Sequence, residues 1–242
     1  MSGRKNTISL MLPVLALAFT VHAWGVEPYS IEPVTVQASA YLPASVVRGL
    51  DPQGSRLVTP INGLKTTVSE VWWAKSVPTH DNPSTSDGLF YGGLQVGGLV
   101  GVIHFLADVN PDFREDFRDR KLRAGYYTMR YAQKPVDKEH KEVSPYRDFL
   151  VLSPVSVDRD PDKVLAMDEL LKWSRLATRS RHPAILSLVP PGKDYKNLPV
   201  LQTDDAGTCI MHVKLHSQGE KSGPSLDLAI ILITPRNENG ES

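Results

Sequence analysis

Four side chains that could bind a ligand lie within or close to one polar loop of the sequence, residues 135–145. Arg130 precedes this loop and His140 lies within it. Arg147 and Asp148 follow it directly. If the stretches on either side are paired strands, these side chains should meet near one end of a sheet. The four residues are therefore the candidate ligand-binding residues, but the favoured explanation is an Arg–Asp pair that only holds the loop, with the ligand site as the alternative.

A second hypothesis uses three of the same residues for an enzyme or a metal-dependent protein, with a site assembled around His140, Arg147 and Asp148. The chain contains neither a Gly-x-Ser-x-Gly nor a His-Glu-x-x-His motif. The glycine pairs at 92–93 and 97–98 have the spacing of a phosphate loop, but the lysine that such a loop requires is absent. We predict no catalytic residue and no cofactor, and the sequence favours a protein that is not an enzyme.

A group of acidic residues resembles a calcium-binding loop. Asp158, Asp160, Asp162 and Glu169 occupy positions 1, 3, 5 and 12 of that pattern. Position 6, where the loop normally turns on glycine, is Lys163, and the residues before the loop are typical of a strand rather than a helix. The acids are better explained by a following helix, because the dipole at a helix start attracts negative charge. No metal ligand is therefore predicted.

The only cysteine, Cys209, begins a stretch in which apolar and polar residues alternate. Successive side chains of a strand face opposite sides, so the odd positions of 209–216 should face the core and the even positions mostly water. Cys209 is then a small buried hydrophobic residue. A copper centre is the alternative, but Cys209 and His212 would lie on opposite faces. His212 and His216 would lie about 13 Å apart along the strand, and we expect both to be exposed.

The elements that must position these residues are mainly strands. Residues 161–180 are the one predicted helix, with Asp160 as its N-cap and Pro161 at its first position. Stretches rich in β-branched and aromatic residues predict the strands, and 89–106 forms either two strands or one strand with bulges. These stretches are 65–76, 89–106, 122–132, 146–152, 184–189, 208–216 and 226–234. The polar loop 217–224 is expected to join the last two as a hairpin. Many strands and one helix predict a mainly β fold, an antiparallel two-sheet β-sandwich of jelly-roll or immunoglobulin-like type.

The first residues have the pattern of a secretory signal peptide. Arg4 and Lys5 precede an apolar run, which ends in a small-x-small site at Ala23. We expect cleavage after Ala23, a periplasmic or secreted protein, and no transmembrane span in the mature chain. The 242 residues include 27 basic and 27 acidic ones, so the chain has no overall field that would attract nucleic acid.

The sequence predicts four parts, of which one is a folded domain. The parts are a signal peptide at 1–23, an extended N-terminal segment at 24–55, a β-sandwich domain at 56–234 and a disordered tail at 235–242. The charged stretch 108–121 within the β-sandwich domain is expected to be a solvated loop.

Two short motifs lie on neighbouring predicted strands. Residues 122–127 read Leu-x-Ala-Gly-x-Tyr, and residues 146–149 read Tyr-Arg-Asp-Phe. In these motifs the chain resembles uncharacterised secreted bacterial β-sandwich proteins of unknown function, over roughly residues 68–190. The resemblance implies an exported β-sandwich and no particular activity or site. The favoured interpretation is a non-enzymatic envelope protein that binds another envelope protein or a small ligand.

Overall fold

The computed structural model describes residues 29–80, 88–109, 113–116, 118–135, 144–192, 195–205, 207–218 and 225–234. The expected signal peptide at 1–23 and the expected tail at 235–242 lie outside the described residues, as does His140. The described part of the chain is mainly β, which confirms the predicted fold class at this level.

Ten strands in the described part form one antiparallel sheet. They are β1 (Ser30–Thr35), β2 (Gln53–Ile61), β3 (Leu64–Trp73), β4 (Leu99–Phe105), β5 (Gly125–Gln133), β6 (Asp148–Pro154), β7 (Ala184–Val189), β8 (Val200–Thr203), β9 (Cys209–His216) and β10 (Ser225–Ile233). Strands β1 to β7 lie side by side in chain order, and the sheet then continues through β10 and β9 to β8. The hairpin of β9 and β10 was predicted, whereas β2 and β8 were not.

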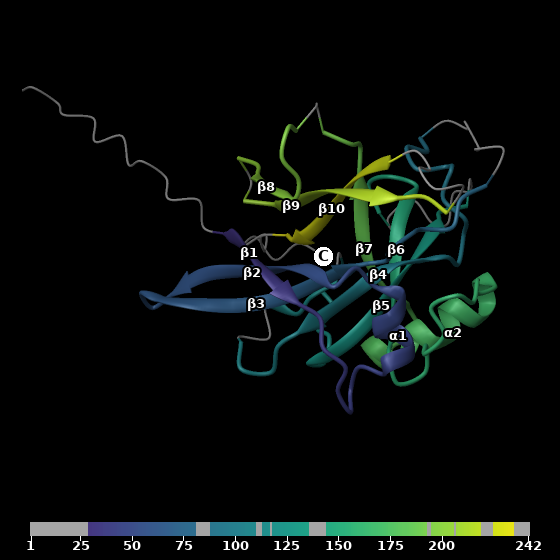
Figure 1. Ribbon diagram of the computed structural model, residues 1–242, viewed down its shortest axis with the longest axis horizontal. Coiled ribbons are helices and arrows are strands. Elements are labelled where there is room, and N and C mark those ends of the chain that lie inside the picture. Colours follow the sequence, from purple (N-terminus) through teal and green to yellow (C-terminus); the bar gives the residue numbers. More distant parts are fainter. Residues whose placement is uncertain are drawn as a thin grey trace, which may run out of the picture.

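The sheet curls until its two ends approach each other. The end strands β1 and β8 are in contact, and Val77 beyond β3 forms a parallel bridge with Ser217 beyond β9. The result is one nearly closed, barrel-like sheet (Figure 1). The prediction of two separate sheets is therefore corrected. An alternating sequence decides which face of a strand is buried, but it does not decide whether the buried faces belong to one curled sheet or to two stacked sheets.

The inside of the barrel is filled with apolar side chains from strands all around the sheet. Met129, Tyr131 and Leu150 on β5 and β6 are completely buried there. The odd-numbered residues of β9, including Cys209 and Met211, face the same core, as predicted. A barrel packed in this way is a rigid scaffold on whose outer face a site can be built.

Two helices cover separate parts of the outer face (Figure 1). The short helix α1 (Ala44–Gly49) places Val46 against Trp72 on the outside of β3. The longer helix α2 (Met167–Thr178) packs Leu170 into a second outer cluster, with residues of β5, β6 and β7. The outer surface of β4 and β5 lies beside both covered areas.

Two predicted segments differ from what the structure shows. The N-terminal segment 24–55, expected to be extended, contains β1, α1 and the start of β2 in its described part. The predicted helix begins only at Met167, with Ala166 rather than Asp160 as its N-cap. The backbone carbonyl of Asp160 instead accepts a hydrogen bond from the buried guanidinium of Arg130, at 2.7 Å. This contact holds the chain against the outer face of the sheet, and the helix therefore begins at a later residue.

Candidate functional site

The predicted site residues do not form one cluster. Arg130 and Tyr131 are neighbours on β5, so their side chains point to opposite faces of the sheet. Asp148 contacts Tyr131 on the inner face, and Arg147 beside it is half-buried. His140 lies outside the described residues. The structure therefore places Arg130 and Asp148 on opposite faces of the sheet. The sequence could not show this, because it does not reveal the register in which the two strands pair.

Arg130 is completely buried, and its guanidinium is fully used by the protein itself. Its Nε and Nη2 donate to the two carboxylate oxygens of Asp158, at 2.6 and 2.7 Å. The remaining N–H groups donate to three backbone carbonyls, those of Gly97, Asp160 and Lys163. All five donors of the guanidinium are thus satisfied. Arg130 anchors the segment before α2 to β5 and has no donor left for a ligand.

Asp148 is also completely buried, and it faces the inside of the barrel. It accepts hydrogen bonds from the Tyr131 hydroxyl at 2.5 Å and from the backbone N–H groups of Phe90 and Tyr91 at 2.7 and 3.3 Å. Burial raises the pKa of Tyr131, and the bond to Asp148 acts in the same direction, so the phenol stays protonated. Asp148 therefore holds the chain at residues 90–91 against β5 and β6.

The acids of the calcium-loop pattern do not converge on one point. Asp158 is buried against Arg130, whereas Glu169 forms an ion pair with Lys163 at 2.8 Å. Among the residues that the structure describes, no three His, Cys, Asp or Glu side chains are grouped so that they could hold a metal ion.

His212 is buried, and the prediction that it is exposed was wrong. The ring of Tyr195 covers it, with the ring centroids 4.6 Å apart, and Gln202 on β8 lies 3.2 Å from its Nε2. Burial lowers the pKa of His212. His216, in contrast, is exposed as expected. Alternation along β9 could not reveal that the chain between β7 and β8 folds back over one of the outward-facing side chains.

A groove of about 720 Å³ lies on the outer face of β4 and β5. We call it the β4–β5 groove. Its walls come from the segment before α1, from the turn that leads into β5 and from the last turns of α2. Residues that line it include Tyr41, His104, Arg123, Tyr126, Arg175 and Leu176.

The floor of the groove is organised by a ladder of side chains across four strands. Arg56, Glu70, His104 and Tyr126 stand directly opposite one another on β2, β3, β4 and β5. Glu70 accepts hydrogen bonds from Arg56 at 2.8 and 3.0 Å and lies 3.1 Å from Nδ1 of His104. The ring of His104 stacks on that of Tyr126, with centroids 3.9 Å apart. Packing between rigid strands fixes both rings in place.

The negative charge of Glu70 determines which ring nitrogen of His104 carries a proton. The hydrogen bond with His104 lowers the pKa of Glu70, burial opposes the shift, and Arg56 reinforces it. The carboxylate is therefore ionised at neutral pH and can only accept, so Nδ1 of His104 carries the proton. Burial raises the pKa of Tyr126, which remains a neutral phenol.

Three arginines give the groove its charge. Arg123 precedes β5, and Arg175 and Arg179 lie one turn apart at the end of α2. All three are exposed, and none forms an ion pair with a described residue. No acidic side chain among the described residues lines the groove. Guanidinium groups without carboxylate partners favour anions, which they bind through paired N–H donors.

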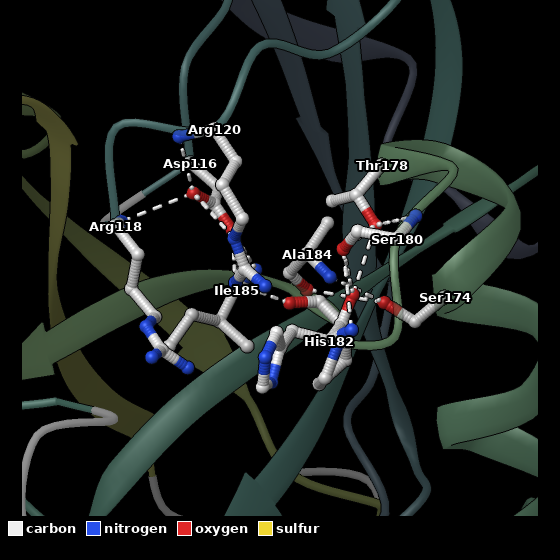
Figure 2. Close-up of polar contacts among 10 residues, drawn as sticks. Asp116, Arg118, Arg120, Ser174, Thr178, Ser180, His182, Ala184 and Ile185 are labelled. Atoms are coloured by element: carbon white, nitrogen blue, oxygen red, sulfur yellow. Dashed lines mark hydrogen bonds and ion pairs between the residues drawn. The ribbon is translucent and has the colours of Figure 1, made fainter.

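A buried carboxylate holds the loop that leads to Arg123 (Figure 2). Asp116 accepts hydrogen bonds from the backbone N–H groups of Arg118 and Arg120, each at 3.0 Å, and from the Arg120 side chain at 2.7 Å. Arg120 also donates to the carbonyl of Pro183 at 2.6 Å. The expectation of a fully solvated loop at 108–121 is thus corrected, because Asp116 is 3% exposed and ties the loop to the start of β7.

The end of α2 is tied to the same place (Figure 2). Ser174 accepts from the N–H of Ala184 at 2.8 Å and donates to its carbonyl at 3.2 Å. The hydroxyls of Thr178 and Ser180 both donate to the carbonyl of His182, at 2.8 and 3.1 Å. The loop before β5 and the end of α2 are therefore attached to one connection, which sets the arginines of the groove relative to one another.

Sequence reasoning missed the groove. In the sequence, Arg179 reads only as a basic residue suited to a helix C-terminus, and Tyr41 lies in a segment expected to be extended. The one available signal was a set of arginines without acidic neighbours at helical spacing, and this signal is common at helix ends. Only the packing of α1 and α2 beside the same strands brings these residues together.

Within the described residues, no helix combines the length and the apolar character needed to span a membrane. No protein-family model, no curated protein and no solved structure matches the chain.

Proposed function

We propose that the chain is an exported, non-enzymatic binding protein and that the β4–β5 groove takes a ligand that carries anionic groups. The observation that supports this most strongly is the set of Arg123, Arg175 and Arg179, which line one groove without an acidic side chain among its described lining residues. Export is supported by the signal-peptide pattern at residues 1–23.

Binding fits this chemistry better than catalysis does. Arginine side chains remain protonated at all ordinary pH values, so they hold and orient charge but do not exchange protons. His104 is already engaged by Glu70 and Tyr126, which makes it part of the floor. A groove with arginines on an anchored backbone and a floor of packed aromatic rings is prepared to receive a ligand with little backbone reorganisation.

The test is a titration of the isotope-labelled mature protein with citrate, observed through the Nε–Hε signals of its arginines by NMR. We expect the signals of Arg175 and Arg179 to move in a saturable way. Arg175→Gln should weaken citrate binding about fivefold, which corresponds to the loss of about 1 kcal/mol from one exposed charge-assisted contact.

Lys214→Gln is the matched control, because it removes one positive charge from an exposed position on β9, away from the groove. It should leave citrate binding unchanged. An equal loss in both variants would show that citrate responds only to net charge, and the proposal would then fail. The mass of the protein recovered from the native host should correspond to a chain that begins after Ala23; an uncut chain contradicts the export part.

A further inference from the structure

We propose that the natural occupant of the β4–β5 groove is an acidic peptide segment of a partner protein, with an apolar side chain seated between Tyr41 and Leu176. This inference rests on the proposed anion-binding function of the groove and names the class of its ligand. Charge complementarity supplies the first argument, since the groove presents three arginines that form no ion pair with a described residue and no acid among its described lining residues.

The types of residue that line the groove are those of protein interfaces. Its described lining contains three arginines and three tyrosines, but no lysine, aspartate or glutamate. Tyrosine and arginine are enriched where binding energy concentrates in protein–protein contacts, whereas lysine and the acidic residues are depleted there. A site for a small inorganic anion would need cations alone and would gain nothing from the exposed rings.

Two large apolar side chains of the groove are left open to solvent. Tyr41 is 78% exposed and Leu176 is 53% exposed, although they belong to elements far apart in the sequence. They are two of only six large hydrophobic residues that are exposed in the described part of the chain. Exposed apolar side chains gathered at one concave place mark a surface that is covered in a complex. An aromatic or aliphatic side chain of the partner would cover them.

The surroundings of these side chains are rigid enough for recognition. The floor rings of His104 and Tyr126 are held by the ladder across β2 to β5, and the backbone segments that carry the arginines are tied down through Asp116 and Ser174. A peptide that binds here would lose its own freedom but would cost little ordering of the protein. The groove therefore suits an extended segment that alternates carboxylates with an apolar anchor.

The test selects a random linear peptide library displayed on phage against the mature full-length protein. Synthetic copies of the selected peptides are then measured by fluorescence anisotropy. We expect the selected peptides to be rich in Asp and Glu and to carry an aromatic or large aliphatic residue. Tyr41→Ser and Leu176→Ser should each weaken peptide binding about tenfold and citrate binding much less, whereas Arg175→Gln should weaken both. Leu64→Ser, at an exposed apolar residue outside the groove, should change neither.

The outcomes separate this inference from the function on which it rests. Citrate binding without any acidic peptide, or peptides that are insensitive to Tyr41→Ser and Leu176→Ser, would overturn the peptide ligand and leave the anion site. If polygalacturonate binds more tightly than any selected peptide, and this binding depends on Arg175, the peptide ligand would be overturned in favour of an acidic polysaccharide. Absence of both citrate and peptide binding would overturn the inference together with the proposed function.

Discussion

Replacing Arg130 by methionine should destabilise the fold by about 3–5 kcal/mol, because it leaves a buried negative charge without its cation. Asp158 is 1% exposed, and its carboxylate would keep only the hydroxyl of Thr128, at 2.5 Å, among the side-chain donors given by the structure. The backbone carbonyls of Asp160 and Lys163 would lose a donor as well. Each orphaned buried group costs about 1–3 kcal/mol, but the segment before α2 can move and recover part of this loss.

The assay is urea unfolding of the protein, followed by tryptophan fluorescence. Adding Asp158→Asn to Arg130→Met removes the buried charge, so the double variant should be more stable than Arg130→Met alone. Arg56→Met is the control, because Arg56 is half-exposed in its pair with Glu70 and should contribute less than about 1 kcal/mol. A loss below about 1 kcal/mol for Arg130→Met, or a double variant less stable than either single one, refutes the argument.

Three further predictions concern other parts of the fold. Gly97→Ala should cost about 2–4 kcal/mol in urea unfolding, because φ is +82° and a Cβ would lie 1.9 Å from the carbonyl oxygen of Leu165. Gly63→Ala, with similar φ and open space, should cost only about 1 kcal/mol. Relative to Glu70→Gln, the wild type should be more stable at pH 7, and the difference should vanish as the pH falls below 4.5, because the folded pKa of Glu70 is lowered; a constant difference across the pH range contradicts this. The folded pKa of His212 is also lowered, so the wild type should lose stability below pH 6.5 more steeply than His212→Gln in the same assay.

Local patterns in the sequence predicted the parts of the fold that depend on neighbouring residues. The alternation of residues along β9 correctly placed Cys209 in the core, since one side of a strand is buried whatever its partners are. The same pattern failed for His212, because a distant segment carrying Tyr195 covers it. The helical spacing near residue 170 identified α2, but its start was wrong because Arg130 holds the preceding residues in another conformation.

The candidate site was less accessible to prediction than the fold. Arg130 and Asp148 were chosen because they bear charges near one loop, but both are used to hold backbone segments in place. Charge in a sequence does not distinguish a ligand-binding side chain from one that satisfies buried groups. The exposed arginines that form no ion pair with a described residue instead lie on α2 and before β5, where the sequence is typical of ordinary helix ends and loops.

The sequence by itself determined the mainly β character of the chain, the hairpin of β9 and β10 and the approximate position of α2. Each of these depends on hydrophobic periods and turn residues within a few positions of one another. Only the tertiary structure decided that the strands close into one curled sheet and that Tyr41, Arg123 and Leu176 share a groove. The physical reason is that closure and the groove arise from contacts between residues far apart in the chain, and these contacts leave no periodic trace in the sequence.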